Sequence, residues 1–248
     1  MNVFFASYGN DSCALIQWAA EHGLTGTVLY NDTGWAGPGW ERRITDCEKW
    51  ARGLGLEVVR TKSMGLFALA KKKKAWPRNG MQFCTTHLKQ RPSLEWLDEH
   101  DPAGVAVCYV GVRREESRAR AEFPAVVESS EMHGGREVRA PLVGHTTADR
   151  DELLEWAGIV PLPHRSMECW PCVNGNKADL LTLTDARIDE IERLEAEMGF
   201  TSNGKPRVMF RPAAHKGGVG IREAVRWAKS DRYHPDQMDM CLDGWCGV

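Results

Sequence analysis

Short apolar segments alternate with helical patterns along the first 145 residues, and this alternation constrains the fold more than any other feature of the chain. The strand-like segments are residues 2–6, 26–31, 56–60 and 105–110, and the helical patterns are residues 12–22, 39–53 and 86–99. Short buried strands separated by helices of this length form parallel sheets. The pattern therefore predicts an α/β fold with a doubly wound, mostly parallel sheet and helices on both faces.

The C-terminal part of the chain has a helical pattern without further strand-like segments. Residues 146–157 begin with a threonine cap and early carboxylates, which predicts a helix. Residues 178–198 are typical of one or two acidic amphipathic helices, and residues 218–229 of another. Between them, residues 158–178 are rich in Pro, Gly and Cys and are expected to form an ordered loop. We expect a helical extension of the same domain.

Composition excludes several classes of protein. Hydrophobic residues make up 42% of the 248 residues and charged residues 27%, as in a soluble globular protein. The formal net charge of −2 gives no overall attraction to nucleic acid or membranes, so any such surface must be local. No apolar run approaches the ~20 residues of a membrane span, and no signal peptide is recognisable. We expect a cytoplasmic protein without membrane contact.

The first strand-like segment ends in a polar turn, and a helical pattern follows directly. The turn consists of Ser7, Tyr8, Gly9, Asn10, Asp11 and Ser12. A strand, a tight turn and a helix N-terminus form an anion site, because backbone N–H groups point outward and the helix dipole favours negative charge. Ser7 and Ser12 add hydroxyl donors, and Gly9 allows close approach of a phosphate. The alternative is an ordinary turn capped by Asp11 or Ser12.

The turns after the second and third strands also carry polar residues. Asp32, Thr33 and Gly34 suit contact with a ribose, an adenine edge or a metal, or else form an Asx-capped turn. The segment Lys71–Lys74 is expected in a loop above the sheet, where it reaches polyphosphate or a nucleic-acid backbone while Trp76 stacks on a base. A solvated charged face is the alternative interpretation of the lysines.

Cations accumulate at two later positions. Lys89 and Arg91 are placed to hold phosphate or sulfate oxygens. Gly111 follows the fourth strand and precedes four arginines, among them Arg113 and Arg118. Arginines at this edge of a sheet suit bidentate recognition of an anion. A surface ion-pair cluster is the alternative.

The eight cysteines fall into two groups. Cys13, Cys47 and Cys108 lie within apolar patterns and are interpreted as small buried hydrophobic residues. The others lie in polar, aromatic or Gly/Pro-marked segments, and they are Cys84, Cys169, Cys172, Cys241 and Cys246. A CxxC pair with distant cysteines suits zinc or an iron–sulfur cluster, and a redox-active dithiol is the third possibility.

In their order along the chain, these segments resemble the phosphoadenosine-phosphosulfate (PAPS) reductase family, within the wider ATP pyrophosphatase group of α/β nucleotide enzymes. The resemblance covers residues 3–175. Ser7–Ser12 is similar to the family's Ser-Gly-Gly-x-Asp-Ser pyrophosphate loop. The other similar segments are Asn31–Gly34 to its Asp-Thr-Gly element, Cys84–Pro92 to its Cys-Thr…Lys…Pro segment, Gly111–Arg118 to its Gly-x-Arg…Glu-Ser…Arg segment, and Pro141–Ile159 with Cys169 and Cys172 to its Pro-Leu…Gly-Ile-Pro…CxxC ending.

The resemblance implies a nucleotide-binding domain over residues 1–160, and a helical extension with the cysteine site over residues 161–248. The implied nucleotide-binding residues are Ser7, Tyr8, Gly9, Asn10, Asp11, Ser12, Asp32, Thr33, Gly34 and Gly111. The implied catalytic residues are Ser12, Lys89, Arg113 and Arg118, acting with magnesium, and Cys246. The partners implied are an adenine nucleotide (ATP, PAPS or APS), nucleic acid, other sulfur-transfer proteins and a second copy of this chain.

Three departures from the family pattern leave alternatives open. Tyr8 stands where the family has the first glycine of its loop, and Asn10 where a lysine is common. The Glu-Cys-Gly-Leu-His tail that supplies the attacking thiol of the reductases is missing, so Cys246 is a substitute nucleophile, or either Cys241 or Cys246 is a fourth metal ligand. The single Cys84 with a CxxC pair is most similar to iron–sulfur members that act in DNA phosphorothioation.

The sequence therefore leaves three functions open. The first is cleavage of ATP to AMP and pyrophosphate, which activates a substrate such as nucleic acid for sulfur insertion. The second is reduction of a sulfonucleotide to sulfite through a cysteine thiolate. The third is a non-catalytic nucleic-acid-binding subunit with structural zinc. A [4Fe-4S] cluster is the cofactor that the cysteine pattern favours, with zinc as the alternative.

Overall fold

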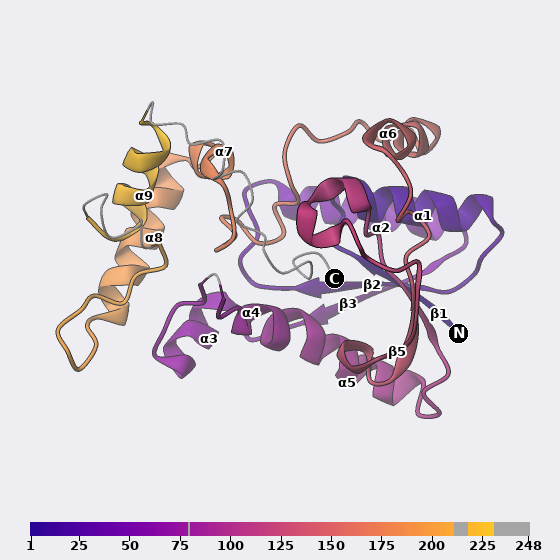
Figure 1. The fold of residues 1–248 in the computed structure, drawn as a ribbon, viewed down its shortest axis with the longest axis horizontal. Helices are drawn as coiled ribbons and strands as arrows, with labels where there is room; N and C mark the ends of the chain where they lie inside the picture. Colours follow the sequence, from indigo (N-terminus) through magenta and orange to yellow (C-terminus); the bar gives the residue numbers. More distant parts are fainter. Residues whose placement is uncertain (79, 211–217, 231–248) are drawn as a thin grey trace.

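The computed structural model describes residues 1–78, 80–210 and 218–230. Its centre is a six-stranded sheet in the order β3-β2-β1-β4-β6-β5 (Figure 1). The strands are β1 (Asn2–Ala6), β2 (Thr27–Asp32), β3 (Glu57–Lys62), β4 (Val107–Tyr109), β5 (Val126–Ser130) and β6 (Arg136–Arg139). Only β5 runs antiparallel to its neighbour, while the other pairings are parallel. The predicted fold class is confirmed.

The four predicted strands are present as β1 to β4, whereas β5 and β6 were not predicted. Their sequences, Val-Val-Glu-Ser-Ser and Arg-Glu-Val-Arg, are short and polar and lack the apolar run of a buried strand. They form because β6 pairs with β4 and β5 then pairs with β6. Hydrogen bonding to an existing sheet stabilises these two strands, although their composition alone does not favour a buried strand.

Helices cover both faces of the sheet (Figure 1). The helices before β4 are α1 (Asn10–Glu21), α2 (Trp40–Gly53), α3 (Leu66–Lys73), α4 (Phe83–Thr85), the π-helical turn η1 (Thr86–Gln90) and α5 (Arg91–His100). The short turns after β4 are η2 (Arg114–Glu116), η3 (Arg118–Arg120) and η4 (Glu131–His133), and the later helices are α6 (Thr147–Trp156), α7 (Lys177–Leu181), α8 (Asp185–Met198) and α9 (Ile221–Ala228). Among the helices described, none is long and apolar enough to cross a bilayer.

The alternation of side chains in β1 divides the core between the two faces. Phe4 and Ala6 point toward α1, α2 and α6 and belong to one buried cluster. Val3 and Phe5 point the other way, into a cluster with Leu97 of α5. Cys13 and Cys47 are buried in the first cluster and Cys108 in the second. Their interpretation as small buried hydrophobic residues is confirmed.

A third buried cluster joins α8 and α9 to α3 rather than to the sheet. Leu66 and Leu69 of α3 lie in it with Ile191 of α8 and Val225 of α9. The C-terminal helices therefore extend from one end of the sheet (Figure 1). The boundary drawn at residue 160 stays a prediction.

The lysine run is a correction to the sequence interpretation. Lys71–Lys73 form the last turn of α3 rather than a loop, and only Lys74 lies beyond the helix. Trp76 is 5% exposed and packs with Trp35 and Phe67, so it offers no face to a base. The apolar residues Leu66, Leu69 and Ala70 bury one side of α3 and leave the lysines in solvent.

Candidate functional site

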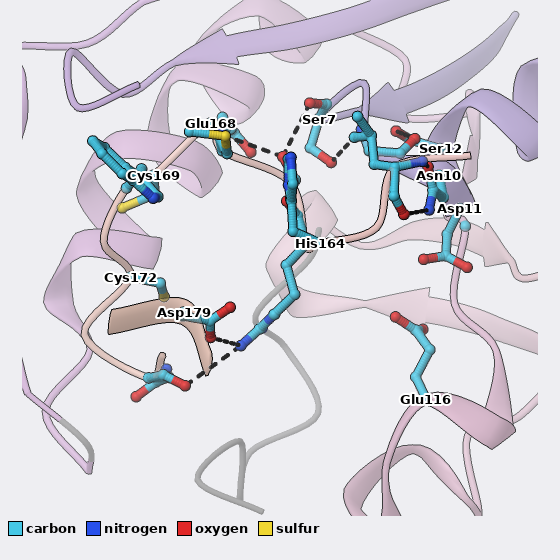
Figure 2. Close-up of a pocket in the computed structure, with 18 of the residues that line it drawn as sticks. Ser7, Asn10, Asp11, Ser12, Glu116, His164, Glu168, Cys169, Cys172 and Asp179 are labelled. Atoms are coloured by element: carbon cyan, nitrogen blue, oxygen red, sulfur yellow. Dashed lines mark hydrogen bonds and ion pairs between the residues drawn. The ribbon is translucent and has the colours of Figure 1, made fainter. Parts of the chain in front are cut away.

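A cavity of about 700 Å³ opens beyond the carboxyl ends of β1 and β4. One side is the turn Ser7–Ser12 with Gly111 and Arg113, and the other is residues 162–182 with the CxxC turn. Figure 2 shows the two sides facing each other, with Ser7, Asn10 and Ser12 opposite Cys172 and Asp179. This is the position at which a parallel α/β sheet holds its ligand.

The turn Ser7–Ser12 presents the start of α1 to the cavity. Gly9 is the N-cap residue, and no side chain of the described residues caps the helix there. The Ser7 hydroxyl accepts a hydrogen bond from the Gly9 amide at 3.5 Å, and the Ser12 hydroxyl donates to the Gly9 carbonyl at 3.2 Å. Asp11 and Ser12 therefore do not act as the caps that the alternative interpretation required. The amides of the first turn remain available to an anion.

Two glycines of the site stand where a side chain has no room. A Cβ on Gly111 would lie 2.8 Å from the Asp11 carbonyl oxygen, so the loop after β4 lies directly against the first turn of α1. A Cβ on Gly9 would lie 3.0 Å from the Ser166 Cβ. The close approach of these backbones fixes the shape of the loop.

Residues 162–168 form the wall above the loop and are held by hydrogen bonds from it. The Asn10 side chain pairs with the Leu162 backbone in both directions, at 2.9 Å each. The Ser166 hydroxyl donates to the Ser7 carbonyl at 3.3 Å, and Thr33 donates to the Glu168 carbonyl at 2.8 Å. Asn10 therefore holds residues 162–168 above the loop by two hydrogen bonds. It stands where a lysine is common in the family that the motifs resemble.

Cations that line the cavity are paired with carboxylates. Arg113 Nε donates to Asp11 at 2.5 Å, and Arg113 also pairs with Glu115 at 3.1 Å. The other pairs are Arg120 with Glu116, Lys89 with Glu168 at 3.2 Å, Arg150 with Asp151 at 2.5 Å, and Arg165 with Asp179 at 3.6 Å. An anionic ligand must therefore compete with carboxylates for these cations.

The Lys89–Glu168 pair is the most buried of these, with side-chain exposures of 18% and 5%. Burial disfavours both charged forms, and it raises the pKa of Glu168 although Lys89 opposes the shift. For Lys89 the nearby Glu168, Cys169 and Cys172 outweigh burial and raise its pKa. Lys89 therefore carries a positive charge at the border between the cavity and the cysteines.

Three of the predicted cysteines come together behind Lys89. The CxxC turn is fixed by Trp35, whose carbonyl accepts from the Trp170 amide at 2.8 Å, and by Arg187, which donates to the Trp170 carbonyl. A hydrogen bond from Cys169, the Asn174 amide and nearby cations lower the pKa of Cys172 to about 6. Burial and the neighbouring Cys172 raise the pKa of Cys84.

Thiolates are the donors that zinc and iron–sulfur clusters take. Cys84, Cys169 and Cys172 are the predicted ligands that the structure describes, whereas Cys241 and Cys246 lie outside the described residues. Within the described ranges, no group of three or more His, Cys, Asp or Glu side chains is arranged to hold a metal ion. The described residues alone do not make a complete metal site.

The cavity contains only part of the predicted set. Its lining includes Ser7, Gly9, Asn10, Asp11, Ser12, Lys89, Gly111, Arg113, Cys169 and Cys172. Absent from the lining are Tyr8, Asp32, Thr33, Gly34, Cys84 and Arg118. Asp32 accepts from the Gly34 amide at 2.8 Å, which is the Asx turn that the sequence left open. The roles of all these residues in binding and catalysis stay predictions.

Sequence reasoning missed the second half of the lining. Arg150, Arg165, Ser166, Glu168 and Asp179 all line the cavity. Glu168 had one signal, because it directly precedes the first cysteine of the CxxC pair. The others reach the cavity through the path of the chain after α6, which no local pattern predicts.

Comparison with known proteins agrees with the motifs. Residues 1–174 match the profile of the phosphoadenosine phosphosulfate reductase domain. The chain belongs to this family, as the order of its motifs predicted. An uncharacterized 37.8 kDa protein of Escherichia phage 186 is 26% identical over 279 aligned positions, which cover 87% of this chain and 80% of the phage protein.

Two solved structures are similar at low sequence identity. One is the PAPS reductase from Candida auris in a phosphate complex, with 16% identity, a TM-score of 0.45, and coverage of 64% of this chain and 74% of that one. The other is the NMN synthetase from Francisella tularensis, with 13% identity, a TM-score of 0.48, and coverage of 96% and 87%.

Proposed function

We propose that this chain binds an adenine nucleotide in the cavity and cleaves ATP to AMP and pyrophosphate, so activating an acceptor for sulfur insertion. The observation that carries the proposal is the uncapped N-terminus of α1, which faces the cavity together with Arg113 and Lys89. Amides at a helix N-terminus and cations beside them are what polyphosphate requires.

In the proposed reaction an acceptor oxygen or other nucleophile attacks the α-phosphorus of ATP. The bond to the β-phosphate breaks, pyrophosphate leaves, and the acceptor carries AMP until sulfur displaces it. Phosphoryl transfer of this kind is accelerated mainly by positioning and by neutralising charge. A bound Mg²⁺ supplies part of that neutralisation.

Different residues of the cavity bind the pyrophosphate, neutralise its charge and exclude water. The first-turn amides of α1 and the Ser7 and Ser12 hydroxyls bind the leaving pyrophosphate. Arg113 exchanges its ion pair with Asp11 for one with phosphate oxygens. Lys89 places a positive charge next to the CxxC turn and neutralises negative charge on the phosphates. The Asn10 clamp keeps residues 162–168 over the loop and so limits the access of water to the reacting phosphate.

The test is release of pyrophosphate from ATP with magnesium by the purified protein. Ser12→Ala is expected to reduce the rate at least tenfold, because it removes a donor from the loop. Ser202→Ala, in an exposed turn, is the matched control and should leave the rate unchanged. Absence of nucleotide binding by calorimetry would overturn the proposal and favour the non-catalytic nucleic-acid-binding subunit.

Reduction of a sulfonucleotide is the second candidate, and Cys172 favours it. Cys172 lines the cavity, and the hydrogen bond from Cys169 lowers the pKa of Cys172, which favours its thiolate. The thiolate would attack the sulfur of the sulfonucleotide and release the nucleotide. Cys169 would then attack the S-sulfocysteine, releasing sulfite and leaving a disulfide, which an external dithiol reduces.

The two candidates differ in their products. Incubation with PAPS and a dithiol should release sulfite in the second case and none in the first. Cys172→Ser would abolish sulfite release, whereas Cys108→Ser, a buried cysteine of the sheet, should retain it. Pyrophosphate from ATP without sulfite from PAPS would settle the choice in favour of the first.

For the first function only, since the second needs Cys169 and Cys172 as free thiols, we propose further that Cys84, Cys169 and Cys172, with Cys241 or Cys246, hold an iron–sulfur cluster rather than the alternative, zinc. The support is the thiol-only donor set gathered next to Lys89. Anaerobic purification with metal and sulfide analysis tests it, since a cluster gives a broad band near ~400 nm. Loss of iron on Cys84→Ala but not on Cys13→Ala would support the assignment, and one zinc without sulfide would overturn it.

A further inference from the structure

The lysine run of α3 does not stand alone, because the helix that contains η1 adds cations to the same surface. Lys72, Lys73 and Lys74 are exposed at the end of α3, and Arg91 is exposed at the start of α5. The two helices lie side by side, because Leu69 of α3 and Leu88 of η1 belong to the same buried cluster. His87 adjoins Leu88, and after burial the cations Lys73, Arg91 and Lys72 lower its pKa. We call Lys72, Lys73, Lys74, His87 and Arg91 the basic patch.

Among the described residues, no carboxylate forms an ion pair with the lysines and the arginine of the basic patch. Lys71 pairs with Glu197 at 2.7 Å, whereas Lys72, Lys73, Lys74 and Arg91 form no ion pair with any residue that the structure describes. The cavity shows the opposite arrangement, with carboxylates beside its cations. A local positive potential therefore exists on a chain whose formal net charge is −2.

Helix stability does not account for the whole patch. Lysines in the last turn of α3 interact favourably with the negative end of that helix dipole. This reason does not extend to the second helix, because residues 83–100 are helical throughout and His87 and Arg91 are four residues apart on one face. Burial and the nearby Lys73, Arg91 and Lys72 lower the pKa of His87, so the repulsion acts between Arg91 and the lysines of α3. Such an arrangement is relieved by an anionic partner.

We infer that the basic patch binds the sugar–phosphate backbone of a nucleic acid strand. Phosphates spaced along a backbone match cations spread over two helices, whereas a single free phosphate would engage only one or two of them. Because Trp76 is buried, it does not stack on a base, and the patch is expected to bind without strong sequence preference. Nucleic acid would thus be held mainly through its backbone.

This inference deepens the proposed function, because it makes nucleic acid the acceptor. The π-helical turn η1 carries His87 of the patch and Lys89 of the cavity, so the two surfaces meet on one element. The two proposals are tested separately, since strand binding is measured without ATP and pyrophosphate release without a strand.

The test is the binding of a fluorescein-labelled oligothymidine of about 20 nucleotides to the full chain, followed by anisotropy against salt. The triple variant Lys72→Gln, Lys73→Gln, Lys74→Gln is expected to weaken binding at least tenfold at about 50 mM salt, and to reduce the slope of log K against log salt by about 2. The control triple variant is Lys49→Gln, Arg193→Gln, Lys205→Gln, which removes the same charge from exposed positions elsewhere and should bind as the unmodified protein does.

A second measurement locates the strand directly. Bound oligothymidine should protect Lys72, Lys73 and Lys74 from acetylation while Lys49 and Lys205 stay reactive. The inference is overturned if no strand binds at low salt, if the two triple variants bind alike, or if the three lysines are not protected. Tighter binding to phosphatidylglycerol vesicles, lost in the same variant, would also overturn it in favour of a lipid surface.

Discussion

Tyr8 combines a glycine-like backbone with a large buried side chain. Its φ is +55°, in the left-handed region where the related loops carry glycine. Its ring is fully buried and stacks on Tyr30 with centroids 5.4 Å apart. Its carbonyl accepts from Arg43 Nε at 2.6 Å. Packing and this hydrogen bond hold a strained residue in a loop that faces the cavity.

The Tyr8 hydroxyl makes no hydrogen bond with the described residues, although it is buried. Tyr8→Phe is therefore expected to raise the free energy of unfolding by about 1 kcal/mol, since an unpartnered polar group is removed. Tyr8→Gly should lower it by about 2–4 kcal/mol, because lost ring burial exceeds the relief of backbone strain. Urea denaturation measures both. A less stable Tyr8→Phe variant would show that the hydroxyl has a partner, such as a buried water.

At the scale of elements, the site depends on how β4 meets α1. Gly111, two residues after β4, lies against the first turn of α1, and the wall at residues 162–168 hydrogen-bonds to the same turn. The sequence predicted the strand, the turn and the helix, because each has a local apolar or capping pattern. It did not predict the wall, because contacts between residues 152 positions apart leave no periodic signal.

Gly111→Ala tests this junction. Its Cβ would meet the Asp11 backbone at 2.8 Å, so we expect the free energy of unfolding to fall by about 1–3 kcal/mol and nucleotide affinity to fall with it. Gly53→Ala is the matched control, since no atom lies within 4 Å of its added Cβ and the residue is helical. That variant should gain about 0.5–1 kcal/mol. Equal stability of the two variants in urea would contradict the close approach.

At the scale of the whole molecule, two buried titratable groups couple the fold to pH. His133 is 3% exposed, accepts or donates one hydrogen bond with Ser130 at 2.9 Å and packs on Phe5. Burial, and then Arg136, lower its pKa to about 4. Asp101 lies opposite Arg136 at 2.7 Å, and hydrogen bonds from Arg136 and two amides outweigh burial and lower its pKa.

These shifts predict acid sensitivity in two windows. The unfolded chain binds a proton on His133 below its ordinary pKa of 6.5, while the folded chain resists it until about 4, so stability falls by about 3 kcal/mol as pH drops across this range. Asp101 stabilises the fold above its ordinary pKa of 3.8, and that contribution is lost only at lower pH. Thermal unfolding of His133→Gln should show a flatter profile between pH 6.5 and 4. An unchanged slope would mean that other groups control it.

The sequence by itself determined the class of fold, the family and one side of the cavity. Strands β1 to β4, the turn Ser7–Ser12 and the CxxC pair are each encoded by neighbouring residues, through apolar periodicity, glycine and spacing. Only the tertiary structure decided that Trp76 is buried, that Asn10 forms hydrogen bonds with Leu162, and that Lys89 forms an ion pair with Glu168. Those outcomes depend on packing and charge pairing between segments far apart in the chain, and such energies are set only once the segments have met.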